Sequence, residues 1–239
     1  MRHLFRNLAL CSLVSCSATQ NDLEVHGALR AMFHEGQTGT MIALDELLPN
    51  PNLYAVGALT ELSGEITILG GTAYLSYPED ESTARTDTLT VSDAGATLLV
   101  STEVREWVHT TTQQPIAFAD LDEAIVKLAF GAGFSREDRF PFMLEGNFES
   151  LAWHVIDGTR LASGGTSHED HLAASVQTRR EQARAKIIGF YSPRDQTIFT
   201  HHDSTTHMHC VLDSPVATGH VDHVVVPAGT LVRLPADWR

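Results

Sequence analysis

Three histidines near the C-terminal end of the chain have spacings that suit a metal site. His207 and His209 are separated by one residue within the strand-like segment 206–212. Because successive side chains of a strand point to opposite faces, these two imidazoles project to the same side. If residues 213–219 fold the chain back as a hairpin, His220 lies beside the pair. Neutral imidazole binds zinc and related metals, and three protein ligands leave positions open for water and substrate. The spacing therefore predicts a catalytic metal centre.

Four nearby residues fit this site less well. His223 is an odd number of residues from His220, so we expect it to face away. His201 and His202 precede an aspartate in a predicted loop. We interpret both as solvated, with a supporting or ligand role as the alternative. Cys210 alternates to the face opposite His209 and is expected in the core.

Short strands separated by Gly- and Pro-containing turns must position these histidines. The expected strands are 54–57, 65–69, 72–77, 86–91, 98–100, 104–108, 185–190, 206–212, 220–226 and 230–234, with a further hairpin of 140–144 and 148–155 around 145–147. The expected helices are 23–32 ending near Gly36, 121–130 between the cap Asp120 and Gly131, and 168–185 as a surface helix or insertion. The pattern predicts a sheet-dominated α+β fold.

The charge balance of the chain limits its partners. The 239 residues are 43% hydrophobic, which is enough to bury a core, and 16 Lys and Arg stand against 30 Asp and Glu. The formal charge of −14 would repel a phosphate backbone, so nucleic acid is not an expected partner.

The N-terminus has the features of an export signal. Arg2 and Arg6 precede a short apolar run, 8–14, and then Cys16 in a polar stretch. Residues 13–16 are similar to the lipobox of bacterial lipoproteins, which predicts a signal over 1–16 and a lipid anchor at Cys16. We expect an exported, periplasmic or extracellular protein. The alternatives are a buried N-terminal helix or cleavage at another small residue.

Several motifs occur together in a fixed order along the chain. They are GALTELSGE at 57–65, GFYSP at 189–193, HMH at 207–209 and TGHV at 218–221. With these motifs the sequence resembles the α-acetolactate decarboxylase family from about Leu23 to Leu234. The resemblance implies two β-sheets with flanking helices, His207, His209 and His220 as zinc ligands, and Glu65 as the acid/base carboxylate. It also implies a single domain over 22–239, with a sheet half at about 22–155 and a metal-site half at about 156–239.

Two positions depart from the family pattern. Family members carry an arginine eight residues after the Gly of a Gly-x-Phe strand, where it engages the substrate carboxylate, and here that position is His154. The family also places a C-terminal glutamate in the site, but no Glu follows Glu181. Arg160 or Arg194 are alternative readers of the carboxylate. Asp222 and Asp237 are alternative acids.

The resemblance implies zinc-dependent decarboxylation of a 2-hydroxy-3-keto acid, with 2-acetolactate giving acetoin and CO₂. Glu65 would deliver the proton, which requires burial to raise its pKa, and protonated His154 would contact the substrate carboxylate. The expected partner is a small β-keto acid, with a homodimer as one oligomeric alternative. Two other functions stay open. One is an exported metal- or ligand-binding protein without turnover, and the other is a cupin-like metalloenzyme of different chemistry.

Overall fold

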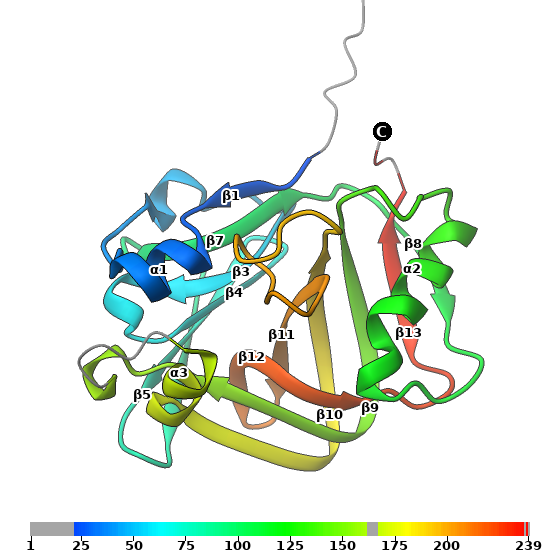
Figure 1. Ribbon diagram of the computed structural model, residues 1–239. Coiled ribbons are helices and arrows are strands. Elements are labelled where there is room, and N and C mark those ends of the chain that lie inside the picture. Colours follow the sequence, from blue (N-terminus) through cyan, green and yellow to red (C-terminus); the bar gives the residue numbers. More distant parts are fainter. Residues whose placement is uncertain (1–21, 162–166, 237, 239) are drawn as a thin grey trace, which may run out of the picture.

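The first seven strands of the chain form one antiparallel sheet. The computed structural model describes residues 22–161, 167–236 and 238. The strands of this sheet are β1 (Glu24–His26), β2 (Ile42–Ala43), β3 (Leu53–Leu59), β4 (Glu65–Leu69), β5 (Thr72–Pro78), β6 (Ala84–Leu89) and β7 (Gly95–Glu103). Their order is β1-β7-β3-β4-β5-β6, and β2 pairs with β7 (Figure 1).

The remaining strands form a second antiparallel sheet. They are β8 (Trp107–Thr111), β9 (Phe140–Val155), β10 (Val176–Tyr191), β11 (Thr206–Asp213), β12 (Val216–Val225) and β13 (Leu231–Pro235). Their order is β10-β11-β12-β9-β13-β8, and β10 also pairs with β9, so β9, β10, β11 and β12 close a ring of pairings. Strand β12 packs against β4 and β5 of the first sheet. The predicted α+β fold of two sheets is confirmed.

Three short α-helices flank the sheets: α1 (Leu29–Glu35), α2 (Leu121–Gly131) and α3 (His168–Ala174). In Figure 1, α1 lies beside the first sheet and α2 beside the β8–β13 edge of the second. No helix in the described part of the chain is long and apolar enough to cross a membrane. The predicted signal at 1–16 and Cys16 lie outside the described residues.

Alternation along β4 explains how this strand serves both faces of its sheet. Ile66 and Ile68 are fully buried in a small core cluster on the outer face. Glu65 and Thr67 therefore project to the opposite face, toward the second sheet. Burial of each isoleucine contributes roughly 1.5–3 kcal/mol. A slip of one residue would exchange the two faces, so these isoleucines fix the register that points Glu65 inward.

The predicted hairpin at 140–155 is wrong, because β9 is one continuous strand. Gly146 pairs with Ala185 of β10, and Glu145 pairs with Leu231 of β13, so partners on both sides satisfy the backbone where the sequence signals a turn. Arg233 donates to the Glu145 carboxylate at 2.9 Å. Tertiary pairing thus overrides the local turn preference. The first sheet ends at Glu103, so β9 belongs to the second sheet and not to an N-terminal sheet half.

The predicted helix at 168–185 is also wrong beyond its first turns. Only α3 is helical, with a capping box between Ser167 and Asp170. Residues from Val176 onward form β10, which pairs with β9 along its length. The charged segment contains no Gly or Pro that would mark the end of the helix. Its pairing with the distant strand β9 determines its conformation.

The predicted helix at 23–32 begins later than expected. Residues 24–26 form β1, paired with β7, and Gly27 separates it from α1. Gly27 has φ +81°, and a Cβ there would lie 2.1 Å from the carbonyl oxygen of Thr97, so only glycine fits. The helix then ends at Gly36, as predicted.

Asp122, and not the predicted cap Asp120, forms the hydrogen bonds that join the start of α2 to the start of β11. Asp120 makes no side-chain capping bond. The Asp122 carboxylate accepts hydrogen bonds from Thr205 N at 2.7 Å, Thr205 Oγ1 at 2.8 Å and Thr206 Oγ1 at 2.6 Å. These bonds hold the start of β11, and Asp122 also lies in the first turn of α2, where negative charge is favourable.

We expect Asp122→Ala to lower the free energy of unfolding by about 2–3 kcal/mol, because it leaves several partly buried donors without their acceptor. The matched control Asp120→Ala removes only a charge near the helix N-terminus and should cost about 1 kcal/mol or less. Chemical denaturation followed by circular dichroism measures both. Equal losses for the two variants would contradict the role assigned to Asp122.

Candidate metal centre

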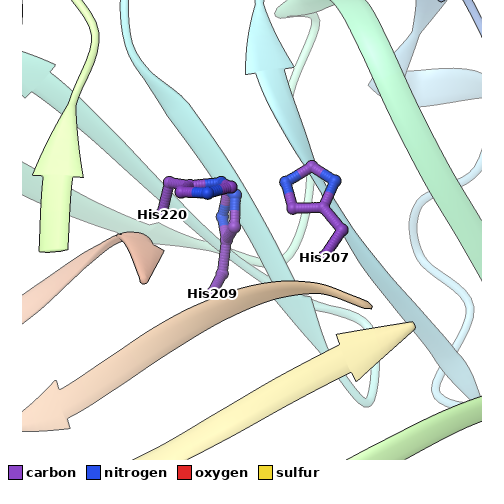
Figure 2. A group of neighbouring side chains, drawn as sticks. All are labelled: His207, His209 and His220. Atoms are coloured by element: carbon purple, nitrogen blue, oxygen red, sulfur yellow. The ribbon is translucent and has the colours of Figure 1, made fainter. Parts of the chain in front are cut away.

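The three histidines of the β11–β12 hairpin converge. His209 of β11 pairs directly with His220 of β12, and His207 lies two residues earlier on the same face of β11. One ring nitrogen from each residue lies within 4.8 Å of the others. Figure 2 shows the rings gathered on one side of the β11 ribbon. The geometry expected from alternation and a hairpin return is present.

Glycine lets the two strands around this hairpin approach closely. Gly219 directly precedes His220, and a Cβ at Gly219 would lie 2.3 Å from the carbonyl oxygen of His154 on β9. A larger residue would separate β12 from β9 at this point. The close approach places His154, which pairs with His220, in the same row as His209. Three neighbouring strands thus contribute one imidazole each.

Burial keeps the three convergent imidazoles neutral. Burial lowers the pKa of His207 to about 3, and the neighbouring His201 adds to this effect. Burial likewise holds the pKa of His209 and of His220 well below the ordinary value. In both residues the second-largest cause is the charge of His207, which also lowers the pKa. Neutral imidazole has a free lone pair, which is the form that binds a metal ion.

Two threonines determine which nitrogen of His209 carries its proton. Thr218 Oγ1 donates to the carbonyl oxygen of Cys210 at 2.7 Å, so it must accept from Thr67 Oγ1 at 2.6 Å. Thr67 has then used its hydrogen and must accept from His209 Nδ1 at 3.0 Å. The proton therefore lies on Nδ1, and the lone pair of Nε2 faces the cluster.

His209 Nε2, whose lone pair faces the cluster, is buried without a hydrogen-bond partner among the described residues. An unpaired buried polar atom costs about 1–3 kcal/mol. A cation bound at this nitrogen would satisfy it. Three neutral imidazoles are a donor set that suits zinc and its neighbours, so the residues present fit such an ion.

Glu65 lies beside this cluster, at the start of β4. Its side chain is 6% exposed. Glu65 Oε2 is 3.7 Å from His209 Nε2, and Glu65 Oε1 accepts a hydrogen bond from Ile156 N at 3.3 Å. Burial raises the pKa of Glu65 to about 8, against the opposing effects of His154 and of the Ile156 hydrogen bond. The carboxyl group can therefore hold a proton at neutral pH.

His154 lies on the other side of Glu65. His154 Nε2 is 3.9 Å from Glu65 Oε1, and His154 Nδ1 is 2.7 Å from Asp222 Oδ1. Burial disfavours the charged imidazole, but the hydrogen bond and charge of Asp222, together with Glu65, outweigh it and raise the pKa of His154. The position that departs from the family arginine is thus occupied by a group that favours positive charge.

Two cavities meet at the cluster. The small cavity has a volume of about 60 Å³ and is lined by apolar side chains together with Glu65, His154, His207 and His220. The larger cavity, about 810 Å³, has a mixed polar and apolar lining that includes Asp122, His202 and Asp222. His201, Thr206 and His220 line both cavities. The polar groups of the site therefore lie between an apolar pocket and a wide opening.

Other candidates from the sequence have different positions. Arg160 and Arg194 are exposed and do not line either cavity, so neither is placed to read a substrate carboxylate. Asp237 lies outside the described residues. His201 is half-buried, with its ring 6.0 Å from that of His220, and is therefore not the solvated loop residue we expected.

Of the remaining two candidates, Cys210 follows the expectation from alternation and His223 does not. His223 pairs with Ala152 and His220 with His154, two residues apart on β9, so the irregularity in β12 puts His223 on the same side of the sheet as His220. The ring of His223 lies 5.4 Å from that of Phe118, and His223 does not line the small cavity. Cys210 is fully buried in the core.

Sequence reasoning missed three residues of the site. Thr67 and Thr218 orient His209, and His171 of α3 lines the small cavity. Thr67 is two residues after Glu65, so alternation places both on one face, and this signal was available. Nothing in the local sequence indicates that His171 approaches the site.

Comparisons with known proteins identify the family of the chain. The family model described as alpha-acetolactate decarboxylase matches residues 26–234. Among solved structures, the chain is similar to a Staphylococcus aureus protein of unknown function described as similar to alpha-acetolactate decarboxylase. The identity is 20% and the TM-score 0.67, over 89% of this chain and 84% of that chain.

The chain is also similar to alpha-acetolactate decarboxylase from Bacillus subtilis strain 168. The identity is 14% and the TM-score 0.66, over 89% of this chain and 85% of that chain. No curated protein matches the chain. The solved structures share the fold, and the family model covers nearly all the described residues. The chain therefore belongs to the alpha-acetolactate decarboxylase family.

Proposed function

We propose that this protein is a zinc-dependent carboxy-lyase that decarboxylates a 2-hydroxy-3-keto acid, with 2-acetolactate giving acetoin and CO₂. Family membership supports a decarboxylase, in place of the cupin-like alternative. The observation that carries the proposal is the juxtaposition of Glu65, a buried carboxyl group with a pKa of about 8, with three neutral imidazoles. Proton delivery and metal binding are thus available within one pocket.

Each residue has a distinct role in this reaction. His207, His209 and His220 would hold the ion. Bound zinc supplies Lewis-acid chemistry, which stabilises the negative charge that develops on the ketone and hydroxyl oxygens of the substrate. When the bond to the carboxylate carbon breaks, its electron pair stays on the substrate and a proton must replace CO₂. Glu65 holds that proton at its carboxyl group and regains one from solvent afterwards.

His154 and the small cavity would bind the rest of the substrate. Protonated His154 contacts the carboxylate, in the role that arginine has in the family pattern. A cavity of about 60 Å³ with an apolar lining that includes Leu62 and Phe199 suits methyl-sized groups and excludes bulk water. Both features favour a small β-keto acid.

A second candidate function has one observation in its favour. No lysine or arginine is among the described residues that line the small cavity. A site without the family arginine could bind a metal and a small ligand without turnover. Stoichiometric zinc together with no decarboxylation across a panel of β-keto acids would favour this alternative.

We expect Glu65→Gln to reduce acetoin formation by about 100-fold or more, because the amide keeps the shape of the protonated acid but cannot deliver its proton. Acetoin and CO₂ released from racemic acetolactate by zinc-loaded protein measure the effect. The matched control Glu61→Gln changes an exposed acid four residues away and should retain wild-type turnover. Full activity in Glu65→Gln, with unchanged zinc content, would contradict the role of Glu65.

We expect Thr67→Val to weaken zinc binding by about 10–100-fold, because valine cannot accept from His209 Nδ1 and the ring loses its fixed orientation. Competition with a chromogenic chelator measures the affinity. Thr97→Val is a suitable control, since Thr97 is equally buried but donates to Gln37 O, away from the cluster. If both variants bind zinc alike, Thr67 does not orient the ligand.

A further inference from the structure

Asp222 is the extra residue of a β-bulge in β12. Two residues of β12 pair with β9 before the bulge: His220 is opposite His154, and Val221 is opposite Trp153. After the bulge, His223 is opposite Ala152. Asp222 therefore has no partner residue on β9. A bulge of this kind redirects a side chain, and bulges are common beside active sites.

The Asp222 carboxylate is hydrogen-bonded to His154. Asp222 Oδ1 lies 2.7 Å from His154 Nδ1. A carboxylate can only accept, so Nδ1 must carry a hydrogen and donate it. The opposite edge of the ring then presents Nε2 toward Glu65, 3.9 Å away. This distance is too long for a hydrogen bond, so Glu65 does not fix the ring.

Asp222 and His154 line different cavities. The Asp222 side chain is 23% exposed and lines the large cavity, whereas His154 is 10% exposed and lines the small one. The hydrogen bond therefore spans the boundary between the two cavities. Rotation of the His154 ring by half a turn would place carbon atoms where its nitrogens lie. Such a ring would face Glu65 with a carbon and would leave Asp222 without its donor.

We propose that Asp222 is a positioning residue: it holds the His154 ring with a hydrogen on Nδ1, so that Nε2 faces Glu65 and the small cavity. The consequence of this positioning for turnover rests on the proposed function, but the orientation of the ring does not.

Nitrogen-15 NMR of protein labelled in its histidine rings tests the orientation directly. The His154 signals are identified as those lost in His154→Gln. In the wild type we expect a hydrogen on Nδ1, and in Asp222→Ala we expect the Nδ1 signal to move to the unprotonated range. An unprotonated Nδ1 in the wild type, or identical His154 signals in both proteins, would overturn the proposal.

Kinetics with acetolactate test the use of this orientation. We expect the KM of Asp222→Ala to rise about tenfold with a smaller change in kcat, because the substrate loses a contact made throughout the reaction. Zinc content should stay at the wild-type level, and the control Asp213→Ala, an exposed acid at the end of β11, should keep the wild-type KM. A wild-type KM in Asp222→Ala would overturn the claim that substrate binding uses this orientation.

These two measurements separate the positioning role from the proposed function. If the wild type forms no acetoin but its His154 signals depend on Asp222, the decarboxylase proposal fails and the positioning of the ring stands.

Discussion

The pairing of His209 with His220 across the β11–β12 hairpin is the constraint on which the site depends. It brings neutral rings together inside the protein, where a nitrogen without a partner is unfavourable. In the cluster, His209 Nε2 is such a nitrogen. Burial lowers the pKa of each ring, so protonation does not relieve the cost. A bound cation would relieve this cost. Metal binding would therefore also stabilise the folded state of this region.

The first sheet completes the site from the opposite side. Because Ile66 and Ile68 occupy the outer core, Glu65 and Thr67 are directed toward β11 and β12. One of these residues supplies the carboxyl group, and the other fixes the proton of His209 through Thr218. Neither sheet alone contains the arrangement. Packing between the sheets is therefore part of the architecture of the candidate site, and a change in the register of β4 would remove both contributions at once.

Local patterns in the sequence predicted the parts of the structure that depend on local geometry. Alternation placed His207 and His209 on one face and Cys210 on the other, and the hairpin return brought His220 to them. The errors lie where distant strands decide. Gly146 marks a turn locally but lies within β9, where it pairs with Ala185 and its neighbour Glu145 pairs with Leu231. Residues 176–185 have no periodicity that reveals β10. The contact between His154 and Asp222 depends on the pairing of β9 with β12, and no local spacing in the sequence predicts that these two strands pair.

The most direct test of the metal centre is the zinc content of purified protein. Wild type and a variant with His207, His209 and His220 all replaced by alanine are loaded with zinc, dialysed and analysed by inductively coupled plasma mass spectrometry. Circular dichroism confirms that the variant is folded. If the three imidazoles bind one ion, the wild type retains about one zinc per chain and the folded variant retains none. Wild-type zinc content in the triple variant would contradict the proposed centre.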